Sequence, residues 1–519
     1  MSEPWILAVD LGTGGPKTGA VTLSGELLAV AHRSVGTTFS DDGGAVQDPE
    51  AWWRAIREGM ADVLAHGVSS GDAAGIGITG QWGSTVPVGA GGEAVGPCLL
   101  WSDTRGRALA AKRLGGPVSI VGYSPGNLVS WLRLTGGAPS PGGADPLGHH
   151  LHLATREPDL YARIETLLEP LDYLGMRFTG RRAATRASMI LSWLTDNRPG
   201  GRDGYQPALL RRSGREAAKL PELLPTGSVL GGLQASVAAE LGLPEAIPVV
   251  AGIPDLHTGY IGSGAVAPYA GHVTISTSAW IGCEVPFKRT DVFHQVASVP
   301  GLRSGSYLVA NNHDTAGICL QWLRDSVGAS DAPARPGGDG YDRLTALAST
   351  APAGAGGVMF TPWLNGERSP VDDRTLRAAF LNISMTTERA HLVRAVLEGV
   401  AFNARWLLDS VERFVKRPMP VLRILGGGAV SDLWCQIHAD ILERRIERVE
   451  APMYANLRGA ALFASMSLGN IDLAGAAARV KVDATFDPDP RTRAVYVPMY
   501  AEYRRLYHRL HGVYERLNA

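Results

Sequence analysis

The sequence predicts an α/β protein built from more than one domain. At 519 residues the chain is too long for a single hydrophobic core, and short apolar strands alternate with helical patterns along it. Apolar residues make up 45% and charged residues 19%, values typical of a soluble globular protein. Two strand–turn–strand patterns, at 6–23 and 272–282, each open about half of the chain. Their recurrence indicates a duplicated, two-domain protein.

Composition also limits the kinds of partner. The net charge of -1 provides no broad basic field for nucleic acid, so small molecules are the expected partners. The sequence contains no run of about 18 apolar residues and no leader pattern before the first strand, which predicts a cytoplasmic protein without membrane contact. The cysteines are far apart and form no C-x-x-C pair, so they are expected to be buried thiols: Cys98, Cys283, Cys319 and Cys435.

The first hairpin pattern carries chemistry at its tip. Freed backbone N–H groups, a hydroxyl, an ammonium and a carboxylate together suit a polyphosphate and its magnesium ion. A Walker loop is excluded because a strand, not a helix, follows the lysine, and a dinucleotide fingerprint is excluded for the same reason. An ordinary glycine-rich turn remains the alternative. The residues concerned are Asp10, Gly12, Thr13, Gly14 and Lys17.

A helix at 52–64 and a short strand at 74–79 come next. The loop at 80–85 follows the strand and contains Gln81 and Trp82. Open α/β sheets usually bind ligands at the carboxyl ends of their strands. We therefore expect this loop to contact a ligand.

The segment Trp101-Ser102-Asp103-Thr104-Arg105 suits a polyhydroxylated ligand. Tryptophan can cover the apolar face of a sugar, while a carboxylate and a guanidinium bind its hydroxyl groups. The alternative is a surface Asp103–Arg105 ion pair beside a half-buried Trp101.

A buried strand at 247–252 leads into Asp255. A carboxylate at the end of a strand can act as a catalytic base, although an aspartate at a helix start is also a common N-cap. Farther along, a long apolar-faced helix is expected at 388–408, and a strand, the glycine loop 426–429 and a helix at 431–442 follow it. A helix N-terminus behind a glycine loop suits an adenosine group.

In this order, the segments resemble the FGGY carbohydrate kinases, which transfer the γ-phosphate of ATP to sugars and polyols. The resemblance covers nearly the whole chain and is nearest to the xylulokinase-like branch. It implies an α/β fold with two ribonuclease-H-like, actin-like ATPase domains facing across a central cleft. The most specific motifs are Asp10-Leu11-Gly12-Thr13, 101–105, Leu364-Asn365-Gly366-Glu367-Arg368-Ser369-Pro370, 379–398, and Gly426-Gly427-Gly428-Ala429 with Gln436 and Asp440.

The resemblance also implies roles for individual residues. Asp255 matches the catalytic aspartate, and Asp10 and Asp255 would hold magnesium. The terminal phosphates of ATP would lie between the first turn and a second grip made by Thr277 and Ser278. Gly426, Gly427, Gly428 and Ala429 would contact adenosine. Gln81, Trp82, Trp101, Asp103 and Asp255 fall where the sugar is expected. The corresponding domains are 1–258, with the sugar site, and 259–519, with the adenosine site; a return of the last helix to the first domain and a homodimer are left open.

Three departures from the family pattern affect these expectations. Trp82 and Gly83 stand where the xylulokinase branch usually has Met-His, and Leu256 stands where asparagine or glutamine often follows the catalytic aspartate. Both changes remove polar contacts from the expected sugar site. Ser276 replaces the usual glycine before Thr-Ser, which adds a side chain near the phosphates.

The resulting prediction is an ATP-dependent kinase of a small ketose or polyol, most readily a pentulose such as xylulose. The alternatives are a kinase of another polyol, a hexulose or a heptulose, a catalytically weak sugar- or nucleotide-binding sensor, and an actin-like or chaperone-like ATPase acting on proteins.

Overall fold

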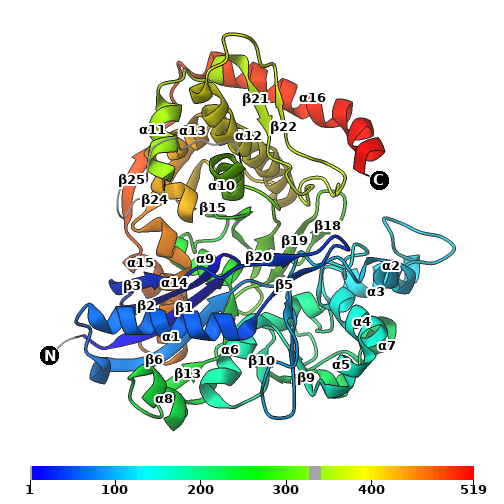
Figure 1. Cartoon of the computed structure of the whole chain (residues 1–519), viewed down its shortest axis with the longest axis vertical. Coiled ribbons are helices and arrows are strands. Elements are labelled where there is room, and N and C mark those ends of the chain that lie inside the picture. Colours follow the sequence, from blue (N-terminus) through cyan, green and yellow to red (C-terminus); the bar gives the residue numbers. More distant parts are fainter. Residues whose placement is uncertain (1–2, 327–339, 519) are drawn as a thin grey trace. The chain divides into compact units, whose positions relative to one another are not determined.

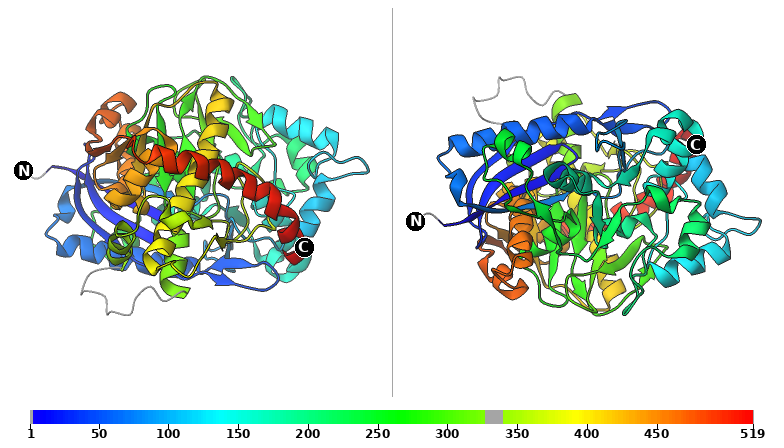
Figure 2. Two further views of the ribbon diagram at one scale, coloured as in Figure 1. Left: turned by 90° about the horizontal axis from the view of Figure 1, so that it is seen from above. Right: turned by 90° about the horizontal axis from the view of Figure 1, so that it is seen from below.

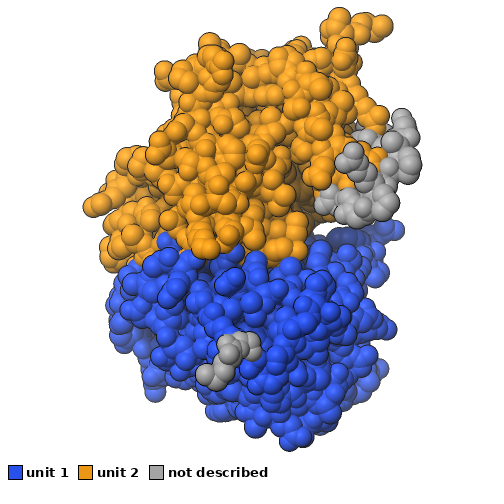
Figure 3. All heavy atoms as spheres, turned by 90° about the vertical axis from the view of Figure 1, so that its left-hand side faces the viewer, with its two compact units in different colours: residues 1–264, 299–306, 456–479 blue, residues 265–298, 307–455, 480–519 orange. Residues whose placement is uncertain are grey.

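The computed structural model describes residues 3–326 and 340–518. The chain forms two compact units, coloured separately in Figure 3. Unit 1 comprises Met1–Gly264, Val299–Ser306 and Asn456–Arg479, and unit 2 comprises Ala265–Ser298, Tyr307–Ala455 and Val480–Ala519. The domain boundary at 258 stays a prediction; the first change from unit 1 to unit 2 comes after Gly264, and two later segments belong to unit 1 again.

The large sheet of unit 1 has the strand order β12-β13-β6-β1-β2-β3, with β14 also pairing with β6. β1, β2 and β3 form an antiparallel meander that includes the predicted hairpin at 6–23. β6 runs parallel to β1, β13 and β14, and β12 pairs antiparallel with β13. The strands are β1 (Trp5–Gly12), β2 (Gly15–Thr22), β3 (Leu27–His32), β6 (Ala73–Gly80), β12 (Val229–Gly232), β13 (Pro248–Val250) and β14 (Ile253–Pro254).

Helix α1 (Pro49–Ala65) covers one face of β2 and β3, as the views of Figures 1 and 2 show. Asp48 caps it by accepting a hydrogen bond from the Glu50 amide, and Pro49 occupies the first turn, where no amide partner is needed. Trp52, Ile56 and Met60 bury its apolar face in the core.

The remaining elements of unit 1 surround this sheet. Its short strands are β4 (Thr38–Phe39), β5 (Ala45–Gln47), β7 (Val86–Val88), β8 (Cys98–Leu99), β9 (Thr166–Leu168), β10 (Ala183–Thr185) and β11 (Glu222–Leu224). Its helices are α2 (Arg107–Leu114), α3 (Pro125–Leu134), α4 (Pro146–Arg156), α5 (Pro158–Arg163), α6 (Pro170–Thr179), α7 (Pro207–Ser213), α8 (Ala235–Leu241), α9 (Asp255–Ser263), α14 (Ala455–Ser467) and α15 (Leu473–Arg479).

Unit 2 repeats the arrangement of a parallel strand beside an antiparallel hairpin. Its main sheet has the order β16-β15-β23-β24-β25, in which β15 pairs antiparallel with β16 and parallel with β23. The strands are β15 (Gly271–Ile275), β16 (Ala279–Gly282), β23 (Val421–Leu425), β24 (Arg445–Val449) and β25 (Val482–Phe486).

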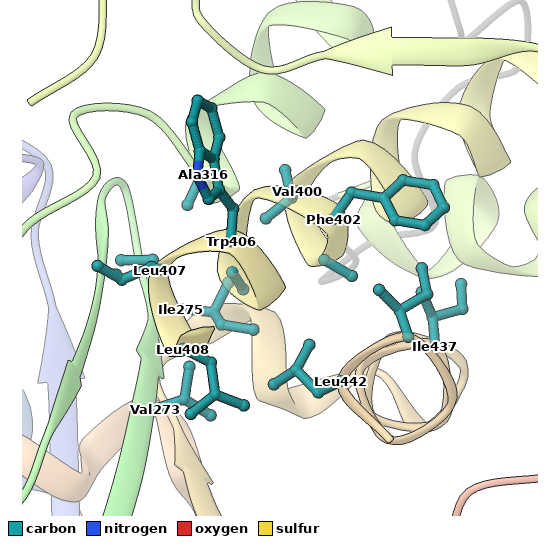
Figure 4. Close-up of a cluster of buried hydrophobic side chains, with 14 of the residues drawn as sticks. Val273, Ile275, Ala316, Val400, Phe402, Trp406, Leu407, Leu408, Ile437 and Leu442 are labelled. Carbon is teal, nitrogen blue, oxygen red and sulfur yellow. The ribbon is translucent and has the colours of Figure 1, made fainter. Parts of the chain in front are cut away.

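The core of unit 2 is built on α12 (Arg389–Val415) and α13 (Asp432–Leu442). Figure 4 shows side chains from α12, α13 and β15 meeting in one apolar cluster, with Val273 and Ile275 on the strand and Ile437 and Leu442 on α13. All four are at most 2% exposed, so their burial contributes about 1.5–3 kcal/mol each to unit 2.

The other elements of unit 2 lie around this core. They are α10 (Gly317–Ser326), α11 (Tyr341–Ser349), α16 (Arg493–Asn518), β17 (Glu284–Val285), β18 (Thr290–Asp291), β19 (Val296–Pro300), β20 (Tyr307–Ala310), β21 (Met359–Thr361) and β22 (Ala379–Leu381). The last helix, α16, belongs to unit 2: the Tyr503 hydroxyl donates to Asn403 Oδ1 of α12 at 3.0 Å. The later segments that belong to unit 1 are Val299–Ser306 and Asn456–Arg479, and the second of these contains most of α14 and all of α15.

Two further sequence expectations can be compared with the structure. The sequence pattern at 160–168 predicts a helix. This prediction is wrong in its second half, because α5 ends at Arg163 and Thr166–Leu168 instead pairs with β7 as strand β9. The cysteines are buried free thiols, as expected. Within the described residues, the helices are all too short or too polar to cross a membrane.

Candidate active site

The first hairpin has a two-residue turn, Thr13-Gly14, between β1 and β2. Asp10 and Lys17 face each other as cross-strand partners, and Lys17 Nζ lies 3.0 Å from Asp10 Oδ2. Asp10 is 3% exposed, and its other oxygen, Oδ1, accepts no hydrogen bond from any residue within 3–326 or 340–518. The turn therefore presents one free carboxylate oxygen beside an ammonium group.

Asp255 lies at the end of the third of three adjacent parallel strands. Thr79 of β6 pairs with Asp10 on one side and with Ile253 of β14 on the other. Two strand spacings, about 10 Å, separate β1 from β14. The Thr79 hydroxyl donates to the Ile253 carbonyl at 2.7 Å and lies 2.9 Å from the Thr258 hydroxyl, so it fixes the start of α9. Asp10 and Asp255 consequently lie on the same side of the sheet, at the carboxyl ends of its parallel strands.

Asp255 is the first residue of α9, and Pro254 occupies the N-cap position without a side-chain cap bond. The N-cap explanation of this aspartate is therefore wrong. Burial, together with the nearby Asp10 carboxylate, raises the pKa of Asp255 to about 7, and the Leu256 amide and Lys17 only partly oppose this shift. A carboxylate with this pKa can accept a proton near neutral pH.

Gln47 of β5 joins the first turn to the loop after β6, and the sequence analysis missed it. Its Nε2 donates to the Thr13 carbonyl at 2.7 Å, while its Oε1 accepts from Gln81 Nε2 at 3.2 Å and from Trp52 Nε1 at 3.0 Å. Trp101 reaches the same turn, since its indole Nε1 donates to Thr13 Oγ1 at 3.2 Å. The structure thus brings together three predicted residues: Thr13, Gln81 and Trp101.

Trp82 lies beside α9. Its indole Nε1 donates to the Ser188 carbonyl at 2.7 Å, and its ring meets the edge of His257 with centroids 6.3 Å apart. His257 is fully buried, and burial lowers its pKa to about 4. Leu256 is also buried, at 6% exposed. The side chains around the start of α9 therefore include the indole of Trp82, the neutral imidazole of His257 and the aliphatic side chain of Leu256.

Asp103 lies inside unit 1 rather than at its surface. Its carboxylate accepts the Ala45 amide at 3.0 Å and pairs with Arg105 through Nη2 at 2.8 Å. The residue is fully buried, whereas Arg105 retains partial exposure. Asp103 thus fixes the loop that carries Trp101, and its contact with a sugar stays a prediction.

The second hairpin, between β15 and β16, ends in the turn Ser276-Thr277-Ser278. The turn is held against the start of α10 by backbone bonds, including Gly317 N to the Ser276 carbonyl at 2.7 Å. Thr277 is exposed. This turn thus offers hydroxyl groups without charge.

The glycine loop lies directly beside this second hairpin. Gly426 has φ +96°, and a Cβ placed there would lie 2.3 Å from the Ile275 carbonyl oxygen. A Cβ on Gly428 would lie 2.5 Å from the Ile275 side chain, while one on Gly427 would meet nothing within 4 Å. Ser431 caps α13 by accepting from the Trp434 amide at 3.2 Å. Bare backbone at Gly427 is therefore accessible next to Ser276.

The chain matches the FGGY family of carbohydrate kinases over both of its domains. The N-terminal domain of the family covers residues 5–114 and 150–262, and the C-terminal domain covers 277–468. The chain belongs to this family. It is therefore a carbohydrate kinase, and the resemblance drawn from its motifs is confirmed.

Individual relatives agree with this assignment. A xylulose kinase of Staphylococcus epidermidis is 26% identical over 98% of this chain and 97% of its own length. Two solved structures from Lactobacillus acidophilus, a ligand-bound xylulose kinase and a gluconate kinase, align with TM-scores of 0.83 and 0.82 at 21% identity, covering 99% of this chain and 100% of theirs. The actin-like ATPase fold with two domains is thus confirmed for this FGGY kinase.

The motif 364–370, to which the sequence analysis assigned no role, forms part of a buried network next to the second hairpin. Glu367 accepts the Asp314 amide at 3.1 Å and Asn403 Nδ2 at 2.6 Å. Burial and the neighbouring Asp314 carboxylate raise the pKa of Glu367 to about 8. Arg374 and Arg368 pair with Asp314, which follows His313, the bridge partner of Ala279. Through Asp314 and its neighbour His313, the motif 364–370 of this FGGY kinase thus holds the start of β16 in place.

The donor set fits magnesium bound together with phosphate. Within the described residues there is no group of three or more His, Cys, Asp and Glu side chains that could enclose a metal ion. Magnesium typically uses one or two carboxylates and completes its octahedron with water and phosphate oxygens. Asp10 Oδ1 and Asp255, at one sheet edge, provide such a set.

Proposed function

We propose that this FGGY kinase transfers the γ-phosphate of ATP to a primary hydroxyl of a five-carbon ketose such as xylulose. The observation that carries the proposal is Asp255, a carboxylate with a pKa near 7 at the strand edge that also carries Asp10. Xylulose kinases among the relatives support the choice of substrate.

In the proposed mechanism Asp255 accepts the proton of the attacking hydroxyl. General-base assistance of this kind typically contributes about 10²–10⁴-fold to the rate. Lys17 and the Thr13-Gly14 turn would neutralise and position the terminal phosphates. Asp10 and Asp255 would hold magnesium, which when bound neutralises phosphate charge.

Unit 2 would bind the rest of the nucleotide. Thr277 and Ser278 would donate to the phosphates, and Gly426, Gly427, Gly428 and Ala429 would lie against the adenosine. Support comes from the adjacency of this loop and the second hairpin, because Gly426 packs on the Ile275 carbonyl. Ser276 lies next to Gly426, and its side chain would narrow the space for phosphate.

Gln81, Trp82, Trp101 and Asp103 would bind or shape the sugar site. Trp82 and Leu256 supply fewer polar groups to a sugar than the residues that the family usually has there, so a second candidate is a substrate other than a pentulose: another polyol, a hexulose or a heptulose. A relative named gluconokinase, from Bacillus licheniformis, is consistent with varied substrates among similar proteins.

The test is sugar-dependent ADP release over a panel of pentuloses, hexuloses, polyols and gluconate, with the phosphate position of each product determined. We expect one pentulose to give the highest kcat/KM and the Asp255→Asn variant to be nearly inactive with it. ATP binding without ADP release on any sugar would instead support a sensor. ATP hydrolysis that does not depend on sugar would support an ATPase acting on protein partners.

A further inference from the structure

A cavity of about 540 Å³ opens in unit 2 between the end of α12 and α16. It lies apart in sequence from the turns and loops of the candidate active site. Its charged lining comprises four cations and two carboxylates: Arg413, Lys416, Arg417, Arg504, Asp409 and Glu412. The cavity therefore carries an excess of positive charge.

Both carboxylates already have partners. Asp409 Oδ2 accepts the Tyr500 hydroxyl at 2.5 Å and lies 3.7 Å from Arg504 Nη1. Glu412 lies 2.9 Å from Arg444, which is outside the cavity lining, and also accepts the Met419 amide at 2.7 Å. Of the four lining cations, only Arg504 is thus paired with an acidic group of the cavity.

The other three cations lie within five residues at the end of α12, and all three side chains are exposed. None of them forms an ion pair with a carboxylate among residues 3–326 and 340–518. Arg413 bonds within its own helix, to the Asp409 carbonyl at 3.1 Å, and Arg417 lies over the Tyr269 ring at 4.4 Å. Their charges are therefore available to a ligand.

Two physical effects can account for a cluster of cations at the C-terminal end of α12. A helix C-terminus attracts positive charge, and one side chain in the last turn would supply it. Three cations on the wall of a hollow, without an acidic partner among the described residues, go further, because a concave surface with an excess of positive charge attracts anions. Guanidinium groups also match phosphate oxygens in geometry, with two parallel N–H donors each.

We propose that this cavity binds a small molecule that carries a phosphate group, held by Arg413, Lys416 and Arg417. The hollow is wide open to solvent, and its volume of about 540 Å³ exceeds what a bare phosphate needs, so it has room for a larger phosphate ester. The site is separate from sugar phosphorylation, so it stands whether or not the proposed substrate is correct.

Equilibrium dialysis of the whole chain with labelled ribose 5-phosphate tests this site, with unphosphorylated ribose as the uncharged control. The Arg413→Gln/Arg417→Gln double variant removes two of the three cations. The matched control is Arg505→Gln, an exposed α16 arginine that pairs with Glu502 and does not line the cavity. Unchanged melting temperatures would show that the variants fold.

We expect the double variant to bind ribose 5-phosphate about tenfold more weakly or worse, and Arg505→Gln to bind it like the wild type. Any binding at the active site is common to all three proteins and cancels in this comparison. Competition by inorganic phosphate at equal concentration would identify free phosphate as the occupant, whereas weak competition would identify the ester. Equal affinity in all three proteins, or no binding by the wild type at millimolar concentration, would overturn the proposal and leave helix-end stabilisation as the role of these cations.

Discussion

The hairpin of unit 1 ends in charged side chains, whereas the hairpin of unit 2 ends in hydroxyl groups. Asp10 and Lys17 pair across β1 and β2, while the turn between β15 and β16 carries Ser276, Thr277 and Ser278. β1 of the first hairpin lies two strands away from β14, which leads into Asp255. The second hairpin instead packs against the glycine loop 426–429. If the proposed function is correct, one backbone motif serves two tasks, catalysis in unit 1 and nucleotide binding in unit 2.

The largest expected effect comes from Asp255→Asn, which removes the proposed base but keeps the shape of the side chain. We expect kcat to fall by about 10²–10⁴-fold while the ATP dissociation constant changes by less than about threefold. Steady-state kinetics and calorimetric ATP binding measure the two. Turnover within about tenfold of the wild type would place the base elsewhere.

The contrast between the two turns is tested by Asp10→Asn beside Thr277→Ala. The first change removes a charge that pairs with Lys17, so kcat should fall about 100-fold and the magnesium requirement should rise. The second removes one neutral hydroxyl, so it should raise the KM for ATP by less than about tenfold with little change in kcat. Similar effects of both variants on kcat would remove the distinction between the turns.

The raised pKa of Asp255 predicts a stability effect in the protein free of magnesium and nucleotide. The native state holds the Asp255 proton up to about pH 7, whereas the unfolded chain loses it near pH 4. Between these values the native state binds more protons, so the contribution of this group falls as the pH rises.

Asp255→Asn should therefore be more stable than the wild type at pH 8 by about 2 kcal/mol, a value reduced for solvent screening, and the difference should shrink towards pH 4. Denaturant unfolding of both proteins at several pH values measures this difference. A difference that stays constant from pH 4 to 8 would show that Asp255 titrates normally.

Gly426→Ala tests the packing of the glycine loop on the second hairpin. A Cβ at this position meets the Ile275 carbonyl oxygen and a backbone with φ +96°, so the free energy of unfolding of unit 2 should fall by about 1–3 kcal/mol. Gly427→Ala is the matched control because open space surrounds its Cβ position, and it should change stability by about 0.5 kcal/mol or less. Equal destabilisation by the two changes would contradict the close approach.

The smallest expected effect is that of Trp101→Phe, which keeps an aromatic face and removes the indole donor to Thr13 Oγ1. Loss of one neutral hydrogen bond should raise the KM for ATP about two- to tenfold and leave the KM for sugar nearly constant. Trp101→Ala should in addition raise the KM for sugar. If Trp101→Phe changed only the sugar constant, the bond to Thr13 would have no part in phosphate binding.

Much of the fold could be predicted because the patterns are local. Glycine and hydroxyl residues between two apolar runs mark both hairpins, and the strand at 421–425 and the Ser431 cap follow from residues a few positions apart. The pattern at 160–168 misled because leucine spacing suits a helix, while pairing with β7, far away in the sequence, decides the strand. Tertiary pairing overrode local propensity there.

The residues of the candidate site were likewise predictable where they stand in local motifs and unpredictable where their partners are distant in the sequence. Asp10, Lys17 and Asp255 stand in recognisable motifs, so the sequence could single them out. Gln47 gains its importance from Thr13 and Gln81, each 34 residues away, and nothing beside it in the sequence signals this. The motif 364–370 draws attention to Glu367, but its partner Asn403, 36 residues away, is not evident from the sequence. The burial of Asp103 was likewise beyond prediction, since its backbone partner is the amide of Ala45, 58 residues earlier.

The position of Gln47 has a mechanical consequence. Its carboxamide bonds to both the Thr13 carbonyl and the Gln81 side chain, so the Thr13-Gly14 turn and the loop at 80–85 share a single anchor. A displacement of either loop must therefore move the other loop or break one of these hydrogen bonds of the buried Gln47 side chain. If the proposed sites are correct, ATP bound at the Thr13-Gly14 turn should make the loop at 80–85 more rigid, and sugar bound at that loop should do the same to the turn. By thermodynamic reciprocity, each substrate would then increase the affinity for the other by the same factor.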